Sequence, residues 1–233
     1  MRGFLIFLVV VVIALVAGDR VAVVLAQNEI GDKIAAEYGM ASRPSVRIGG
    51  FPFLTQAVAG KYHAIEVHAG DWTGEKIAVH DLDVTLTDLA APLSDVLHGN
   101  TANMVADSAS ATARVPYETV QGYAPSGVKS ISYGTDGMHV TGTFTVEGLS
   151  VPGTVVVTVS PTANGISVTP ISVQSAVGGP SLSLSLLRRT LTFVVPLQKL
   201  PLGARLTAIQ PEADGLHVTA VAHNVHLSEA SDK

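Results

Sequence analysis

The chain has 233 residues, 14% charged residues and a formal net charge of −5, which argues against a nucleic-acid partner held by phosphate contacts. It has no cysteine, which excludes disulfides, zinc–thiolate sites, a cysteine nucleophile and a lipid-modified N-terminal cysteine. Hydrophobic residues make up 47% and no basic stripe is present, so any lipid binding must rest on apolar burial rather than on bulk charge.

The N-terminus carries a membrane-targeting segment. Met1-Arg2-Gly3 is a short positive start, Phe4 to Ala17 is an unbroken apolar run, and Asp19-Arg20 ends that run. Its 14 residues suit the apolar region of a signal peptide and are short for a spanning helix, which needs about 20. The tripeptide Val24-Leu25-Ala26 allows cleavage after Ala26; the alternative is an uncleaved anchor in which these residues extend the apolar segment.

We expect residues 1–26 to form a signal peptide or membrane anchor, with a boundary between 17 and 26, and residues 27–233 to form a single domain. In the first half of that domain the sequence predicts a mixture of helices and strands. Gln27 to Tyr38 predicts a helix that stops at Gly39. The elements expected next are a strand at 46–48, a short helix at 54–59, a strand that starts at 62–67, a turn at 70–74 and a half-buried strand at 77–88.

Three hairpins are predicted in the second half. Asp136-Gly137, Asn164-Gly165 and Asp214-Gly215 each stand between two alternating runs, and such pairs tolerate the positive φ angles of a tight turn. The hairpins are expected over about 128–147, 154–173 and 205–227. With the earlier strand pair they predict an antiparallel meander.

Shorter elements complete the pattern. We expect a short helix at Leu93–Leu97, a strand at Asp107–Val115 and one or two helical turns at Tyr117–Tyr123. Ser181 to Val195 begins with strand-like alternation. However, Pro180 and the helical spacing of its leucines favour a helix there.

No motif for catalysis or metal binding stands out. The sequence lacks a phosphate-binding Gly-rich loop with lysine, a Gly-x-Ser-x-Gly turn and a His-Glu-x-x-His motif. His223 and His226 are three apart, so in a strand they point to opposite faces. His139 and His217 each follow a hairpin turn and are expected as partly exposed strand histidines. We therefore predict no metal and no cofactor.

One pair of carboxylates is the best candidate for an enzyme. Asp81 and Asp83 share a strand face, and two carboxylates on one face can serve glycoside hydrolysis. Such a pair is more often a solvated face, and no aromatic sugar platform accompanies it. We therefore expect a protein that is not an enzyme and has no catalytic residues.

Three stretches of the sequence carry a family resemblance. The most specific is Gly49-Gly50-Phe51-Pro52-Phe53-Leu54-Thr55-Gln56, followed by Gly60-Lys61-Tyr62. The others are the strand around Leu82–Leu86, and Leu200–Ile209 followed by Asp214–Ala220. Together they resemble the LmeA-like phospholipid-binding family of actinobacterial cell envelopes. The resemblance runs from about Asp19 to Leu227, and Asp19-Arg20 resembles the family's entry into its first helix, which favours an anchor over cleavage after Ala26.

The resemblance implies an α+β fold like that of the tubular lipid-binding superfamily. A long, strongly curved antiparallel meander would wrap helices and leave an apolar groove. It also implies an exported protein of the periplasm or cell envelope, close to a membrane. Its ligands would be phospholipids, phosphatidylinositol-type lipids included, and it would be linked to mannan elongation of lipomannan and related lipoglycans.

The candidate lipid-contacting residues fall into two groups, for which ordinary core packing is the alternative. We place Phe51, Phe53, Leu54 and Val58 near one end of the groove, and Leu184, Leu187 and Leu191 along the later helix.

The leading hypothesis is a phospholipid carrier or sensor. The alternatives are a non-catalytic module that assists a membrane glycosyltransferase, and an envelope glycan hydrolase.

Overall fold

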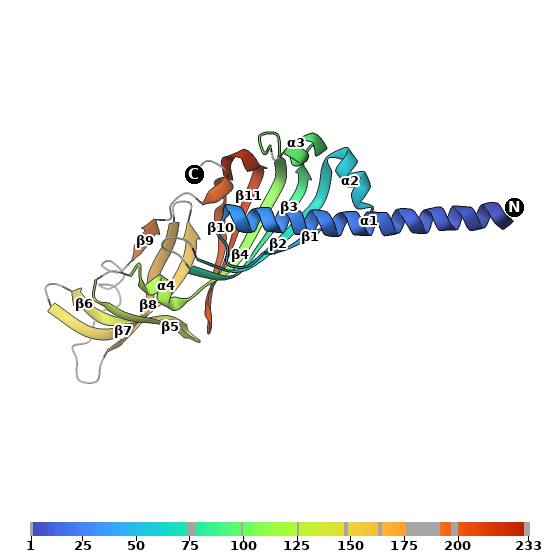
Figure 1. The fold of residues 1–233 in the computed structure, drawn as a ribbon. Helices are drawn as coiled ribbons and strands as arrows, with labels where there is room; N and C mark the ends of the chain where they lie inside the picture. The colour runs from blue at the N-terminus through green and yellow to red at the C-terminus, as the bar shows by residue number, and fades with distance from the viewer. Residues whose placement is uncertain are drawn as a thin grey trace.

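The computed structural model describes residues 2–73, 78–98, 100–124, 126–146, 149–162, 165–175, 192–196 and 200–230. They form helices and two antiparallel sheets, which confirms the α+β class (Figure 1). The helices are α1 (Arg2–Glu37), α2 (Phe53–Ala59), α3 (Leu93–His98) and α4 (Tyr117–Gln121), with 3-10 turns η1 (Pro201–Gly203) and η2 (Leu227–Ala230).

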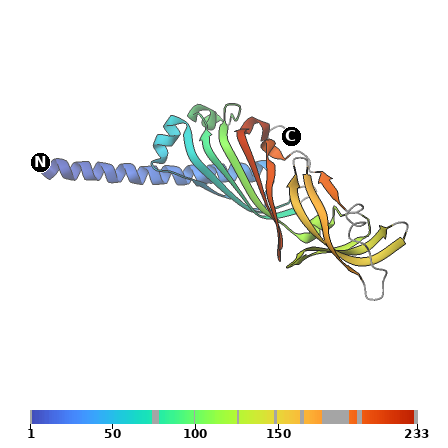
Figure 2. The same ribbon diagram turned by 180° about the vertical axis from the view of Figure 1, so that it is seen from behind.

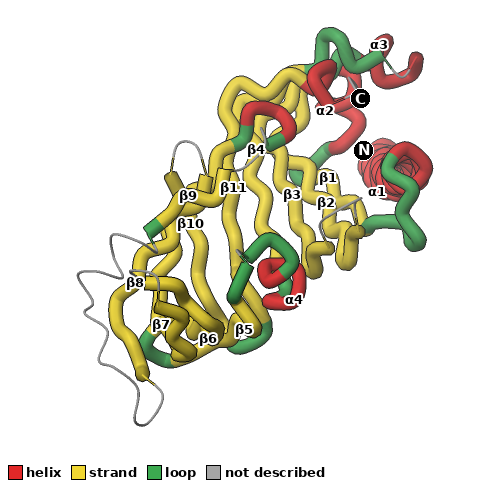
Figure 3. The backbone as a smooth tube through the Cα atoms, turned by 90° about the vertical axis from the view of Figure 1, so that its left-hand side faces the viewer, coloured by secondary structure: helices red, strands yellow, loops and turns green. Residues whose placement is uncertain are grey.

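The first sheet has six strands in the order β1-β2-β3-β4-β11-β10. Its strands are β1 (Ser45–Ile48), β2 (Lys61–Thr73), β3 (Ala78–Ala90), β4 (Val105–Val115), β10 (Arg205–Glu212) and β11 (Gly215–His226). The second sheet has five strands in the order β5-β6-β7-β8-β9. They are β5 (Val128–Gly134), β6 (Gly137–Val146), β7 (Leu149–Thr162), β8 (Gly165–Ser175) and β9 (Phe193–Pro196). The two sheets meet where β10 contacts β7 (Figure 3).

The three predicted hairpins are confirmed as β5–β6, β7–β8 and β10–β11. Gly215 shows why glycine stands at such a turn. Its φ is +146°, and a Cβ atom there would lie 2.6 Å from the backbone oxygen of Val115. The predicted short helices and the strand at 107–115 are also present, as α2, α3, α4 and β4.

Two local predictions are wrong. The turn expected at 70–74 begins as strand, because β2 continues through Thr73 with register shifts on either side of Gly70, which has a φ of +65°. The helix expected to reach Val195 does not, because Phe193–Pro196 pair with β8 as a strand, in keeping with their β-branched and aromatic residues. Leu184, Leu187 and Leu191 lie outside the described residues.

The N-terminal helix is longer than expected. The sequence predicts a targeting segment and then a separate helix from Gln27, but α1 is one helix from Arg2 to Glu37. It projects from the sheets at its N-terminal end and lies beside β1 at its C-terminal half (Figures 1 and 3).

Two clusters of buried residues hold the fold together. The first joins the C-terminal half of α1 to α2 and to β1–β4 and β11, and includes Val23, Ile48, Phe53 and Val225. The second joins β6–β8 to β10 and β11, and Val155 in its centre is 1% exposed. Each cluster therefore includes residues of the first sheet, so this sheet connects the two halves of the molecule.

The segment Gly49–Gln56 is a corner fixed by a buried glutamine. The Gln56 amide donates to the Gly49 carbonyl at 3.1 Å, and its side-chain oxygen accepts from the His63 backbone N–H at 3.2 Å. Gly50 has a φ of +88°, and a Cβ there would lie 2.7 Å from the Gln56 amide. The most specific part of the sequence motif is thus a structural corner that orients α2.

Gln56→Ala should lower the free energy of unfolding by about 1–3 kcal/mol, because it leaves the Gly49 carbonyl and the His63 N–H unsatisfied. Gln210→Ala is the matched control, since Gln210 is an exposed strand amide. Denaturant unfolding of both variants measures the difference. Equal stability of the two would show that the corner does not depend on this amide.

Candidate functional site

A row of apolar side chains crosses the whole six-stranded sheet on its inner face, the face against which α1 packs. The strand register aligns Val46 with Val67, Val67 with Val84, and Val84 with Ala111. Ala111 is aligned in turn with Ala220, and Ala220 with Leu206. We call these six residues the central row.

The residues of the central row differ in how deeply they are buried. Val46 is buried under α1, whereas Val84, Ala111, Ala220 and Leu206 are only partly buried. Of these residues, Val84, Ala111 and Ala220 belong to neither core cluster. The middle of the sheet therefore has an apolar surface that the described parts of the two cores leave partly uncovered.

Small residues dominate the neighbouring strands β4 and β11 at this level. Ala109, Ala111 and Ala113 alternate along β4, and Ala220 and Ala222 lie opposite on β11, with Ala109 and Ala222 buried at the edge of the first core cluster. An alanine stands less far from the sheet than a valine or leucine does, so this surface is lower than its apolar flanks. Such a surface suits an extended hydrocarbon chain, which needs apolar contact but no hydrogen-bonding partner.

The four predicted lipid-contacting residues that the structure describes are not part of the central row. Phe53 is 7% exposed and packs beside Tyr62 in the first core cluster. Phe51, Leu54 and Val58 are 61%, 43% and 80% exposed, on and just before α2. The structure therefore keeps these four residues together at one corner and places three of them outward.

The sequence did contain a signal for the inner face. Asp107–Val115 alternates small apolar and polar residues, and the prediction of a strand there was right. The alternation did not predict which strands would lie beside β4, and so it did not predict which residues would share the inner face of the sheet with those of β4.

A second feature is the corner between α1 and α2. Asp19 is 2% exposed, and its carboxylate accepts a hydrogen bond from the Leu54 backbone N–H at 2.8 Å. It also pairs with Arg20, whose guanidinium lies 4.9 Å from the centre of the Phe51 ring. The first turn of α2 is thereby attached to the middle of α1.

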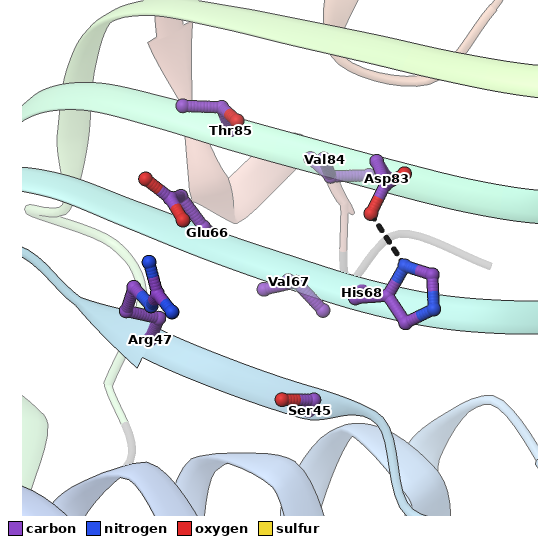
Figure 4. Close-up of a pocket in the computed structure, with 8 residues that line it drawn as sticks. All are labelled: Ser45, Arg47, Glu66, Val67, His68, Asp83, Val84 and Thr85. Carbon is purple, nitrogen blue, oxygen red and sulfur yellow. Dashed lines mark hydrogen bonds and ion pairs between the residues drawn. The ribbon is translucent and has the colours of Figure 1, made fainter.

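The outer face of the same sheet carries a polar hollow of about 400 Å³. Figure 4 shows Arg47 and Glu66 at one end of it, and the Asp83 carboxylate turned toward His68, with a hydrogen bond of 2.6 Å. Asp81 bonds instead to Arg114, at 2.9 Å. The two aspartates of the hydrolase hypothesis thus have different, basic partners rather than each other.

The two Asp-Gly-x-His turns have the same local structure. Asp136 bonds to His139 at 2.6 Å, and Asp214 bonds to His217 at 3.0 Å. The hydrogen bond from the histidine lowers the pKa of each aspartate, against an opposing effect of desolvation. Glu212, Asp214 and His217 place one ligand atom each within 4.8 Å of one another, a spacing that a metal ion could bridge. The Asp214–His217 hydrogen bond and the contact of Arg114 with Asp214, at 3.3 Å, already account for the positions of Asp214 and His217.

A family model described as LmeA-like phospholipid-binding matches residues 17–221, most of the chain. No curated protein and no solved structure matches this chain. The family match begins before Ala26 and so includes the part of α1 that carries Asp19 and Val23.

Asp214→Asn should lower the Tm at neutral pH, and the difference from the parent protein should shrink on acidification. The folded-state pKa of Asp214 lies below its ordinary value of 3.8, so its ionised form stabilises the fold above that pH. This contribution is lost as the pH falls through the folded-state pKa. Thermal melts from pH 7 to pH 3 measure it, with exposed Asp107→Asn as the control. A difference that is the same at every pH would contradict the assignment.

Proposed function

Because this chain belongs to the LmeA-like phospholipid-binding family, we propose that it is a membrane-anchored phospholipid carrier or sensor of the cell envelope, with the central row as its acyl-chain site. The observation that carries this proposal is the partly buried, alanine-rich stretch between the two cores, around Ala111 and Ala220. An apolar surface that the protein itself leaves partly uncovered is explained if a bound ligand covers it.

Hydrocarbon burial alone gives this site useful affinity. Each buried CH₂ group contributes about 0.8 kcal/mol, so an acyl chain lying across several strands needs no cluster of headgroup charges. This agrees with a chain in which 14% of residues are charged. The headgroup would then remain near the edge of the sheet, where polar groups and water are available.

The N-terminal half of α1 supports the membrane location. It belongs to α1, which is long and apolar enough to cross a membrane, and little of its most apolar stretch is buried within the protein. Arg2 at its start favours a cytoplasmic N-terminus with the folded domain on the other side of the membrane. The protein would then work next to the bilayer that contains its ligand.

The resemblance links this lipid binding to elongation of the mannan chain of lipoglycans. In that role the protein would present or sense a phosphatidylinositol-type lipid beside a membrane glycosyltransferase. The alternative is a module that assists the glycosyltransferase without binding lipid. That alternative predicts a filled inner face, whereas Val84, Ala111 and Ala220 are partly buried.

Ala111→Trp should reduce the phospholipid that co-purifies with the full-length protein, because the indole would occupy the surface on which acyl chains lie. Loss of contact with two CH₂ groups corresponds to roughly a tenfold loss of affinity. Ser110→Trp, on the exposed outer face of the same strand, is the matched control. Native mass spectrometry and lipid extraction measure the bound lipid.

Equal lipid recovery from the two tryptophan variants would overturn the assignment of the central row. Shortened lipoglycan mannan in cells that carry Ala111→Trp, and normal mannan with Ser110→Trp, would support the link to elongation. Normal mannan in both, with lipid lost from Ala111→Trp, would contradict that link.

A further inference from the structure

The apolar run that begins α1 is too short to cross a bilayer by itself. Phe4 to Ala17 is 14 residues, about 21 Å at 1.5 Å per residue, whereas the hydrocarbon core is about 30 Å thick. An anchor of this length would pull the next part of the chain into the membrane interface. That part carries Asp19 and Arg20, and the α1–α2 corner lies beside it.

The next two turns of α1 have one face toward the protein and one apolar face left open. Val23 is buried, and Ala22 and Ala26 pack against the first core cluster. On the other side Val21 and Leu25 are 61% and 64% exposed. Counted from Phe4 to Leu25, the apolar surface of α1 is about 33 Å long, which matches the hydrocarbon core.

Asp19 is the obvious obstacle to such a span, and the structure removes it. A charged group at membrane depth must be turned away from lipid, paired and hydrogen-bonded. Asp19 meets all three conditions, because it is 2% exposed, pairs with Arg20 and accepts the Leu54 N–H. Arg20, whose side chain is 48% exposed, is neutralised by its pair with Asp19, and the next charged residue after these two is Glu29, beyond the apolar stretch.

The α1–α2 corner adds apolar surface at this same level. Phe51, Leu54 and Val58 are all exposed, and the hydrogen bond from Leu54 to Asp19 fixes them beside α1. Figure 2 shows α2 next to the point where α1 leaves the sheets. The exposed apolar residues at α2 therefore lie beside α1, at the level where its apolar run ends.

We propose that Phe51, Leu54 and Val58 are embedded in the outer interface of the lipid bilayer, so that the transmembrane segment extends to Leu25 and α2 enters the membrane beside it. The occupant of this surface is lipid rather than another protein, because the surface lies beside the membrane anchor and at the depth where the anchor is too short. The inference rests on the anchored form of the proposed function. It also orients the first sheet, with α2 at its bilayer end.

The absence of cysteine allows a direct test on the full-length chain. Val58→Cys and Leu54→Cys, each labelled with an environment-sensitive fluorophore, are reconstituted in vesicles of phosphatidylcholine and phosphatidylglycerol. Glu118→Cys on α4 is the control, since Glu118 is exposed on a short helix that packs on β5. We expect blue-shifted emission at positions 54 and 58, quenched by nitroxide-labelled lipid and protected from iodide. The label at position 118 should emit without a blue shift, should not be quenched by nitroxide-labelled lipid and should be quenched by iodide.

A second pair of variants tests the role of Asp19 in positioning α2. In the Val58→Cys background, Asp19→Leu removes the acceptor for the Leu54 N–H, whereas Asp19→Asn keeps an acceptor oxygen. With the fold checked by thermal melting, the label at position 58 should move toward water in Asp19→Leu and stay in lipid in Asp19→Asn. No movement in a folded Asp19→Leu protein would overturn this part of the inference.

The outcomes separate this inference from the proposed lipid site. A label at position 58 that iodide reaches as readily as the label at position 118 would overturn membrane embedding, whatever happens to bound lipid in Ala111→Trp. Protection without quenching by nitroxide-labelled lipid, or disulfide-linked dimers of Val58→Cys, would show a protein partner and would also overturn it. Unchanged lipid recovery in Ala111→Trp, with position 58 in lipid, would remove only the acyl-chain site.

Discussion

The buried carboxylate of Asp19 is the constraint on which the arrangement at one end of the molecule depends. A carboxylate with 2% exposure requires partners, and it has them in Arg20 and the backbone N–H of Leu54. Because Leu54 lies in the first turn of α2, satisfying Asp19 also attaches α2 to α1. The Gly49–Gln56 corner and the exposed apolar residues Leu54 and Val58 of α2 lie beside this bond.

The six-stranded sheet has a different role, because it connects two separate cores. Its inner face carries large buried side chains toward each cluster and alanines between them. Antiparallel register places the side chains of successive strands in line, so one row of residues reaches from β1 to β10. A lipid site of this kind needs no special residue; it needs small residues at the same level on neighbouring strands.

Local sequence signals predicted the elements well where chemistry and geometry are local. The Asp-Gly pairs fixed two of the hairpin turns, and alternation identified β4 and much of β3. They failed where the outcome depends on a distant strand. β2 continues past residue 70 because β3 pairs with it there, and Phe193–Val195 are extended because β8 provides the edge.

The sequence alone predicted an apolar N-terminal segment compatible with a signal peptide or an anchor, an antiparallel α+β fold, and a family resemblance carried most specifically by the Gly-Phe-Pro-Phe-Leu-Thr-Gln string. These properties depend on composition, periodicity and short-range turn chemistry. The tertiary structure was needed to show that the Asp19 carboxylate is buried against α2 and that Phe51, Leu54 and Val58 face outward. It also decided that Ala111 lies beside Ala220, since residues more than a hundred positions apart become neighbours only through strand pairing.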